Sequence, residues 1–133
     1  MTSLKSLSLN LECCDEISSN GFFDLFDSFP QLSFLEILNL RIRGNEYLDH
    51  LTPVILFENL QGLGHFQELS LDVLGCRSVF GDCFAIGLDF LDPSRLRKLS
   101  IGFCLETSNQ NLSDFFTVLQ EFSSLTHLDL NFD

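Results

Sequence analysis

Apolar residues recur along the chain in five short segments of one form, Leu-x-x-Leu-x-Leu. The segments are Leu4–Leu9, Leu35–Leu40, Phe66–Leu71, Leu96–Ile101 and Leu125–Leu130. Their starts are 31, 31, 30 and 29 residues apart, and all fifteen marked positions are Leu, Ile or Phe. In a chain with 45% hydrophobic residues, so complete a match at so regular a spacing indicates an internal repeat.

Each apolar segment is followed by residues with helical spacing. The alternation Leu-x-Leu places apolar side chains on one face and polar ones on the other, which is the pattern of a strand. The residues that follow repeat their apolar positions every three or four, which is the pattern of a helix. These helical faces lie within 22–29, 53–63, 80–91 and 112–122. The pattern predicts four strand–helix units and a fifth strand.

Residues near the ends of the predicted helices give further signals. Ser18–Asn20 are candidate N-caps of the first helix. Thr52 is the expected N-cap of the second, with Pro53 at its first position. Asp92-Pro93 is expected to stop the third. The fourth is expected to bury one face made of Leu112, Phe115, Phe116, Leu119 and Phe122.

The order of elements predicts the fold class. Strands that are each followed by a helix and then by another strand of the same kind pair in parallel, with the helices on one side. Units of 29–31 residues leave room for a true helix in each return. We therefore expect an α/β fold, with a curved parallel sheet of about five strands on the concave face and helices on the convex face.

The repeats resemble those of leucine-rich repeat proteins, in the long helix-bearing form of ribonuclease inhibitor. The first unit, Leu7–Gly21, is similar to protist-type repeats of the form L-x-L-x-L-x-x-N-x-I-x-x-x-G. The Asn/Cys position after the strand is matched by Cys104, and by Cys13 or Cys14 with a short offset, whereas Arg43 and Leu74 occupy it in the second and third units. The resemblance implies a solenoid in which the ladder of Asn and Cys side chains that bind the loop backbone is incomplete.

The repeats fill the whole chain. They predict a single domain, residues 1–133, of about 4.5 repeats that start near residues 4, 35, 66, 96 and 125. We find no evident capping unit at either end of the repeats, and solenoids usually need one. The expectation is that neighbouring proteins cover both ends, or that the chain is part of a longer repeat protein.

Composition narrows the choice of partners and compartment. Seven basic and nineteen acidic residues give a net charge of −12, which argues against nucleic acid as a partner. No apolar run is long enough to span a bilayer, so membrane insertion is not expected. The start of the chain has no signal-peptide pattern, and the five Cys are expected to be free thiols. These features predict an intracellular, reducing compartment, most simply the cytoplasm.

Residues that carry chemistry form no convincing set. Ser100, His127 and Asp129 are expected near one another on adjacent strands, but five strands with polar faces produce such a triplet by chance. The sequence shows no phosphate-binding loop, paired-carboxylate motif or metal-ligand spacing. We therefore predict no enzyme activity, and no catalytic, cofactor-binding or metal-binding residues.

Polar positions of the strands form the candidate binding surface. Basic and acidic residues balance within the strand segments, so the net charge of −12 comes from the rest of the chain. Equivalent positions of successive repeats stack into columns, one of them made of small polar residues. The residues expected to contact a partner protein on the concave face are Ser8, Asn39, Arg41, Glu68, Ser70, Asp72, Lys98, Ser100, His127 and Asp129.

Repeat solenoids usually act by offering surface. The first hypothesis is therefore a non-catalytic protein-interaction or scaffold subunit of a larger multi-protein assembly. Alternatives are an inhibitor or regulator that binds an enzyme through the concave face, and a fragment of a longer leucine-rich repeat receptor or adaptor.

Overall fold

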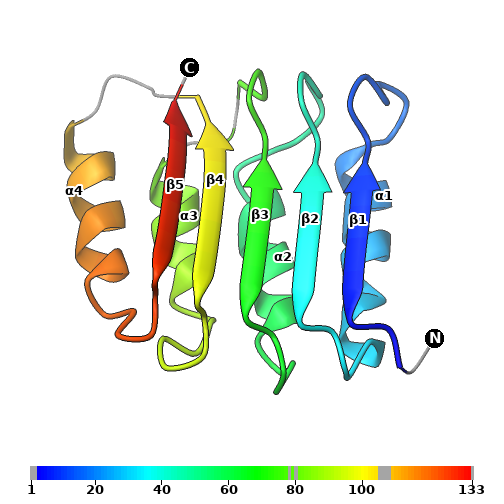
Figure 1. The fold of residues 1–133 in the computed structure, drawn as a ribbon. Coiled ribbons are helices and arrows are strands. Elements are labelled where there is room, and N and C mark those ends of the chain that lie inside the picture. The colour runs from blue at the N-terminus through cyan, green and yellow to red at the C-terminus, as the bar shows by residue number, and fades with distance from the viewer. Residues whose placement is uncertain (1–2, 78, 80, 105–108, 133) are drawn as a thin grey trace.

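The structure is a computed structural model that describes residues 3–77, 79, 81–104 and 109–132. It contains one five-stranded sheet in which neighbours in sequence are neighbours in space, and all four pairings are parallel. The strands, which Figure 1 shows side by side, are β1 (Ser6–Asn10), β2 (Ile37–Arg41), β3 (Glu68–Asp72), β4 (Lys98–Phe103) and β5 (His127–Phe132).

A helix joins each strand to the next. The helices are α1 (Ser19–Asp27), α2 (Thr52–Leu60), α3 (Gly81–Leu88) and α4 (Asn109–Leu119), and a short 3₁₀ turn, η1 (Phe29–Gln31), follows α1. Successive helices pack against each other, and Figure 1 shows α1, α2 and α3 behind the sheet. The predicted α/β alternation is confirmed. No described helix is both long and apolar enough to cross a membrane.

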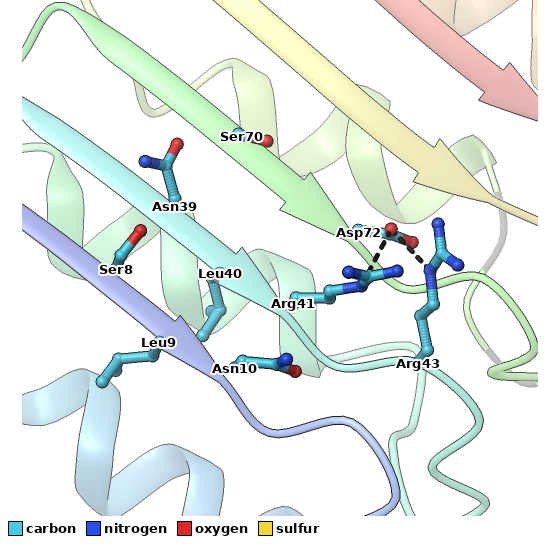
Figure 2. A pocket seen from close by; sticks show the side chains of 9 residues that line it. All are labelled: Ser8, Leu9, Asn10, Asn39, Leu40, Arg41, Arg43, Ser70 and Asp72. Atoms are coloured by element: carbon cyan, nitrogen blue, oxygen red, sulfur yellow. Dashed lines mark hydrogen bonds and ion pairs between the residues drawn. The ribbon is translucent and has the colours of Figure 1, made fainter.

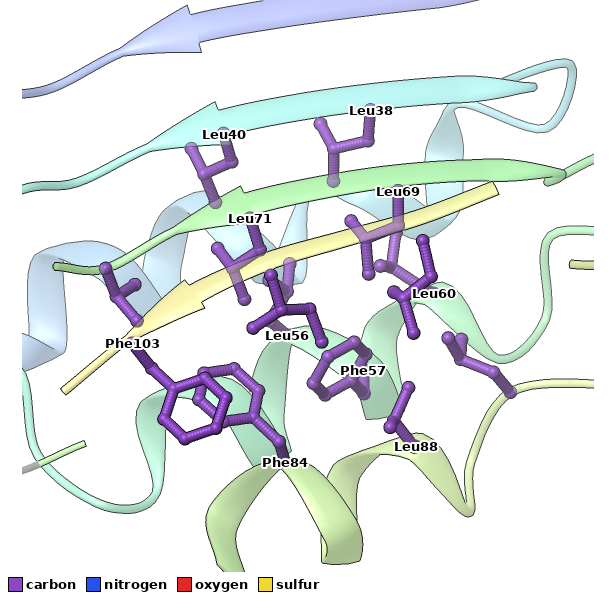
Figure 3. Packing of buried hydrophobic residues seen from close by; sticks show 14 of the residues in the cluster. Leu38, Leu40, Leu56, Phe57, Leu60, Leu69, Leu71, Phe84, Leu88 and Phe103 are labelled. Carbon is purple, nitrogen blue, oxygen red and sulfur yellow. The ribbon is translucent and has the colours of Figure 1, made fainter. Parts of the chain in front are cut away.

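The predicted apolar segments lie in register across the sheet. Leu7, Leu38, Leu69, Leu99 and Leu128 form one paired row. Two residues further along each strand lies a second row of Leu and Ile. On β2, β3 and β4 the side chains of both rows are buried. They pack against the helices, and Figure 3 shows Leu56, Phe57, Phe84 and Leu88 on the helix side of this core.

Phenylalanine supplies much of the bulk between the two layers. Phe57 of α2, Phe84 of α3, Phe103 of β4 and Phe115 of α4 form a chain of ring contacts, with centroids 4.9–6.3 Å apart. All four side chains are fully buried. A Phe ring brings no polar atom that needs a partner, which suits this position.

The helix ends differ in part from expectation. Ser18 caps α1 as predicted, since its hydroxyl accepts a hydrogen bond from the Gly21 amide (3.3 Å). Thr52 is not the N-cap of α2: Leu51 holds that position, and the Asp49 carboxylate accepts the amides of Leu51 and Thr52 instead. Because the Asp49 carboxylate accepts hydrogen bonds from both amides, α2 begins at Thr52, one residue before the start at Pro53 that a Thr52 cap predicts.

Two further expectations about the helices need correction. Helix α3 ends at Leu88, before the predicted stop at Asp92-Pro93. On α4, Phe115 is buried but Phe116 is 43% exposed, because adjacent residues lie about 100° apart on a helix and cannot both face the core. Phe80, predicted on the face of the third helix, lies outside the described residues.

The loops after β2 and β3 contain side-chain contacts to the neighbouring loops. Arg43 and Leu74 were placed at the Asn/Cys position of these loops, where the contacts were expected to be incomplete. The side chain that reaches loop carbonyls is instead Asn45, whose amide nitrogen donates to the Cys14 and Ile17 carbonyls (3.2 and 3.3 Å). In the next repeat the buried Cys76 thiol donates to the Ile42 carbonyl (3.0 Å). Burial raises the pKa of this thiol to about 11, so it keeps the proton that it donates.

Candidate functional site

The face of the sheet opposite the core carries polar side chains in three rows, and we call it the open face. The middle row consists of Ser8, Asn39, Ser70, Ser100 and Asp129, which are paired across the five strands. One flanking row includes Glu68, Lys98 and His127, and the other includes Arg41 and Asp72. All ten residues expected to contact a partner therefore lie on one face.

The middle row forms the floor of an elongated depression. Two hollows, of about 480 and 490 Å³, lie on the open face, and both are lined by Asn39 and Ser70. The first extends to Ser8 on β1 and the second to Asp129 on β5, so together they cross all five strands. We call these two adjoining hollows together the groove. Its floor is low because its residues are small.

One wall of the groove is a cluster of charges at the carboxyl ends of the strands. Asp72 lies between two arginines, as Figure 2 shows. Its carboxylate is 2.7 Å from Nε of Arg43 and 3.8 Å from Nε of Arg41. Glu12, from the loop after β1, is 3.4 Å from Arg41 Nε. Asp72 is held in place by the Leu74 amide, which donates to its other oxygen (3.2 Å).

The opposite wall has simpler ion pairs. Lys98 of β4 is 3.5 Å from Glu68 of β3, and just before β1 and β2, outside both hollows, Lys5 is 3.6 Å from Glu36. These pairs are largely solvent-exposed, so each contributes little to stability. Their effect is local: they leave this wall of the groove nearly neutral.

The β5 end of the groove holds the triplet considered for catalysis. Asp129 Oδ2 is 3.5 Å from the Ser100 hydroxyl, and His127 Nδ1 is 3.0 Å from the Thr126 hydroxyl. Activation of a serine needs the histidine between the hydroxyl and the carboxylate. In the described residues Asp129 contacts the serine directly and His127 contacts a threonine, so the contacts do not follow that order.

Arg43 lines the groove but was not among the residues predicted to contact a partner. Arg43 follows Arg41 by two positions, and residues two apart on an extended chain face the same side, so the spacing could have indicated it. Within the described ranges, no group of three or more His, Cys, Asp or Glu side chains is placed to hold a metal ion.

Comparisons with protein-family models, with curated proteins and with solved structures found no match for this chain.

Proposed function

We propose that this chain is a leucine-rich-repeat solenoid and a non-catalytic interaction subunit that holds a segment of a partner protein in its groove. The groove carries this proposal, because a partly open trough with a floor of hydroxyl and amide groups suits a polypeptide better than a small molecule. The partner belongs to a larger intracellular assembly in which this subunit supplies surface.

The repeat geometry supports the solenoid part of the proposal. Paired strand residues are 31, 31, 30 and 29 positions apart, so each unit adds one strand beside the last. The loop contacts of Asn45 and Cys76 recur at the same interval of 31 residues. A solenoid of this kind buries each repeat only against its neighbours and leaves one sheet face free to bind.

Site-specific photo-crosslinking in the native cells tests the proposal. A photoreactive residue would replace Ser70 or Asn39 in the groove, and Glu58 or Asp89, which are exposed on the helix side, as matched controls. We expect a discrete crosslinked protein from the groove positions and none from the helix side. Adding the substitution Ser100→Arg to these groove variants should abolish the crosslink, because the larger side chain fills the groove. Crosslinks from the helix side alone would contradict the proposal.

A further inference from the structure

The two halves of the groove differ in charge. The hollow over β1, β2 and β3 is lined by two arginines and one aspartate, Arg41, Arg43 and Asp72. The hollow over β3, β4 and β5 is lined by Glu68, Lys98, His127 and Asp129. With His neutral, the charges that line the first hollow sum to one positive and those that line the second to one negative. Glu12, 3.4 Å from Arg41, balances the first hollow, so the two halves differ in free guanidinium donors at one end and a carboxylate without a cation at the other. A ligand that fits both must carry the opposite order.

Arg41 and Arg43 have hydrogen-bond donors that no described residue accepts. Arg43 donates one hydrogen bond, from Nε to Asp72, and Arg41 only approaches carboxylates with its Nε, at 3.4 and 3.8 Å. Among the described residues neither guanidinium makes a further hydrogen bond, so their terminal amino groups stay unpaired. Guanidinium groups bind carboxylates with just these forked donors. Glu12, which pairs with Arg41, does not line the hollow.

At the other end of the groove one carboxylate lacks a cation. Glu36, Glu68 and Asp72 each pair with a lysine or arginine. Asp129 has no such partner in the described part of the chain, where its one hydrogen bond is the 3.5 Å contact with Ser100. A cationic side chain above Asp129 would give this carboxylate the pairing that the other three have.

We propose that the groove binds an extended segment of a partner protein that carries one acidic side chain and, about five residues away, one basic side chain. This inference rests on the proposed function. Strands are about 4.8 Å apart, so Asp129 on β5 lies about 14 Å across the sheet from Asn39 on β2, and Arg41 lies two residues, about 7 Å, further along β2. Arg41 and Asp129 are therefore about 16 Å apart, which an extended chain covers in about five residues. The acidic side chain lies at Arg41 and Arg43, and the basic one at Asp129.

The charges of the protein and of the groove both disfavour the simpler ligands. A segment with acidic residues alone would be repelled by a protein of net charge −12. A segment with basic residues alone would meet Arg41 and Arg43 without a carboxylate to pair with them. A segment with one charge of each sign is neutral as a whole and matches both hollows.

Arrays of immobilised Gly/Ser peptides test the charge order directly. Each peptide carries one Glu and one Lys, two to seven residues apart, in either order, and others carry Glu alone, Lys alone or no charge. We expect binding to peak when Glu and Lys are four to five residues apart. Affinity there should be about fivefold higher than for the singly charged peptides, because one additional exposed ion pair changes affinity by about that factor. Equal binding at all spacings, or none, would overturn the inference.

Variants of the groove separate the two charge contacts. The double variant Arg41→Gln/Arg43→Gln should lose the preference for Glu, and Asp129→Asn should lose the preference for Lys. Arg97→Gln and Asp89→Asn each remove one charge, of the same sign as the corresponding groove variant, away from the groove lining, and as controls they should bind as wild type. Asp129 has one long hydrogen bond, so Asp129→Asn should fold even where the double variant does not.

The two proposals fail in different ways. If crosslinking from Ser70 identifies a partner but Arg41→Gln/Arg43→Gln and Asp129→Asn bind that partner and the peptides as wild type does, the charge order is wrong and the interaction surface stands. If crosslinks form only on the helix side, the proposed function is wrong.

Discussion

Cys13, Gly44 and Gly75 hold the same place in three successive repeats, and all three have a left-handed backbone, with φ of 60°, 70° and 78°. Glycine adopts this conformation without a steric penalty. At Gly75 it has a second use, because a Cβ there would lie 3.3 Å from the backbone of Gly44. Cys13 adopts the same conformation with a side chain, at a cost of roughly 1–2 kcal/mol.

Replacing Cys13 by glycine is therefore expected to stabilise the protein. We expect Cys13→Gly to raise the free energy of unfolding by about 0.5–1 kcal/mol, since the relief of strain exceeds the added flexibility of the unfolded chain. Urea denaturation under reducing conditions measures this. Cys13→Ala is the control, because alanine removes the thiol but keeps the Cβ. An equal gain from Cys13→Ala would show that the backbone is not the cause.

At the scale of the element, strands were easier to predict than loops. The alternation of Leu71 with its polar neighbours is a local property of the sequence, and it placed every strand and the ten residues predicted on the open face. The ladder position at Asn45 was missed because its partners, the Cys14 and Ile17 carbonyls, lie in the preceding repeat. The interval of 31 residues that joins Cys14, Asn45 and Cys76 was the available signal.

Other differences have equally local causes. The start of α2 was misplaced because Asp49, three residues before Thr52, competes as the capping side chain. The groove floor was predicted from the strand period, whereas the pairing of Arg43 with Asp72 depends on side-chain conformations that a repeat pattern does not describe. The pattern thus predicts rows of residues, and the structure is needed to tell which charges within a row remain unpaired.

The loop contacts of Asn45 are expected to contribute measurably to stability. Its side chain is 1% exposed and serves two carbonyls and the Tyr47 amide. Asn45→Ala should lower the free energy of unfolding by about 1–3 kcal/mol, because these buried groups lose their partners. Asn45→Cys should cost less, since a thiol donates a hydrogen bond at the equivalent Cys76. If urea denaturation showed equal losses for Asn45→Ala and Asn45→Cys, the hydrogen bonds of this side chain to the loop would not be the cause.

On the scale of the whole molecule, the two layers differ in charge. Within their bounds, the four helices contain five acidic residues and no basic one. The open face instead balances acidic with basic side chains through pairs such as Lys98–Glu68. Like charges in the helix layer repel one another, and a carboxylate near the carboxyl end of a helix also opposes the helix dipole.

The double substitution Asp24→Lys/Glu58→Lys is therefore expected to stabilise the protein. Both side chains are exposed, on α1 and α2, and the change reduces the net charge from −12 to −8, two units for each residue. We expect a gain of about 0.5–1 kcal/mol in the free energy of unfolding at 10 mM salt, where charges interact over about 30 Å. At 1 M salt that range falls to about 3 Å, so most of the gain should disappear. Asp24→Asn/Glu58→Gln should give about half the effect. A gain that is unchanged by salt would mean that altered helix propensity, rather than charge repulsion, is responsible.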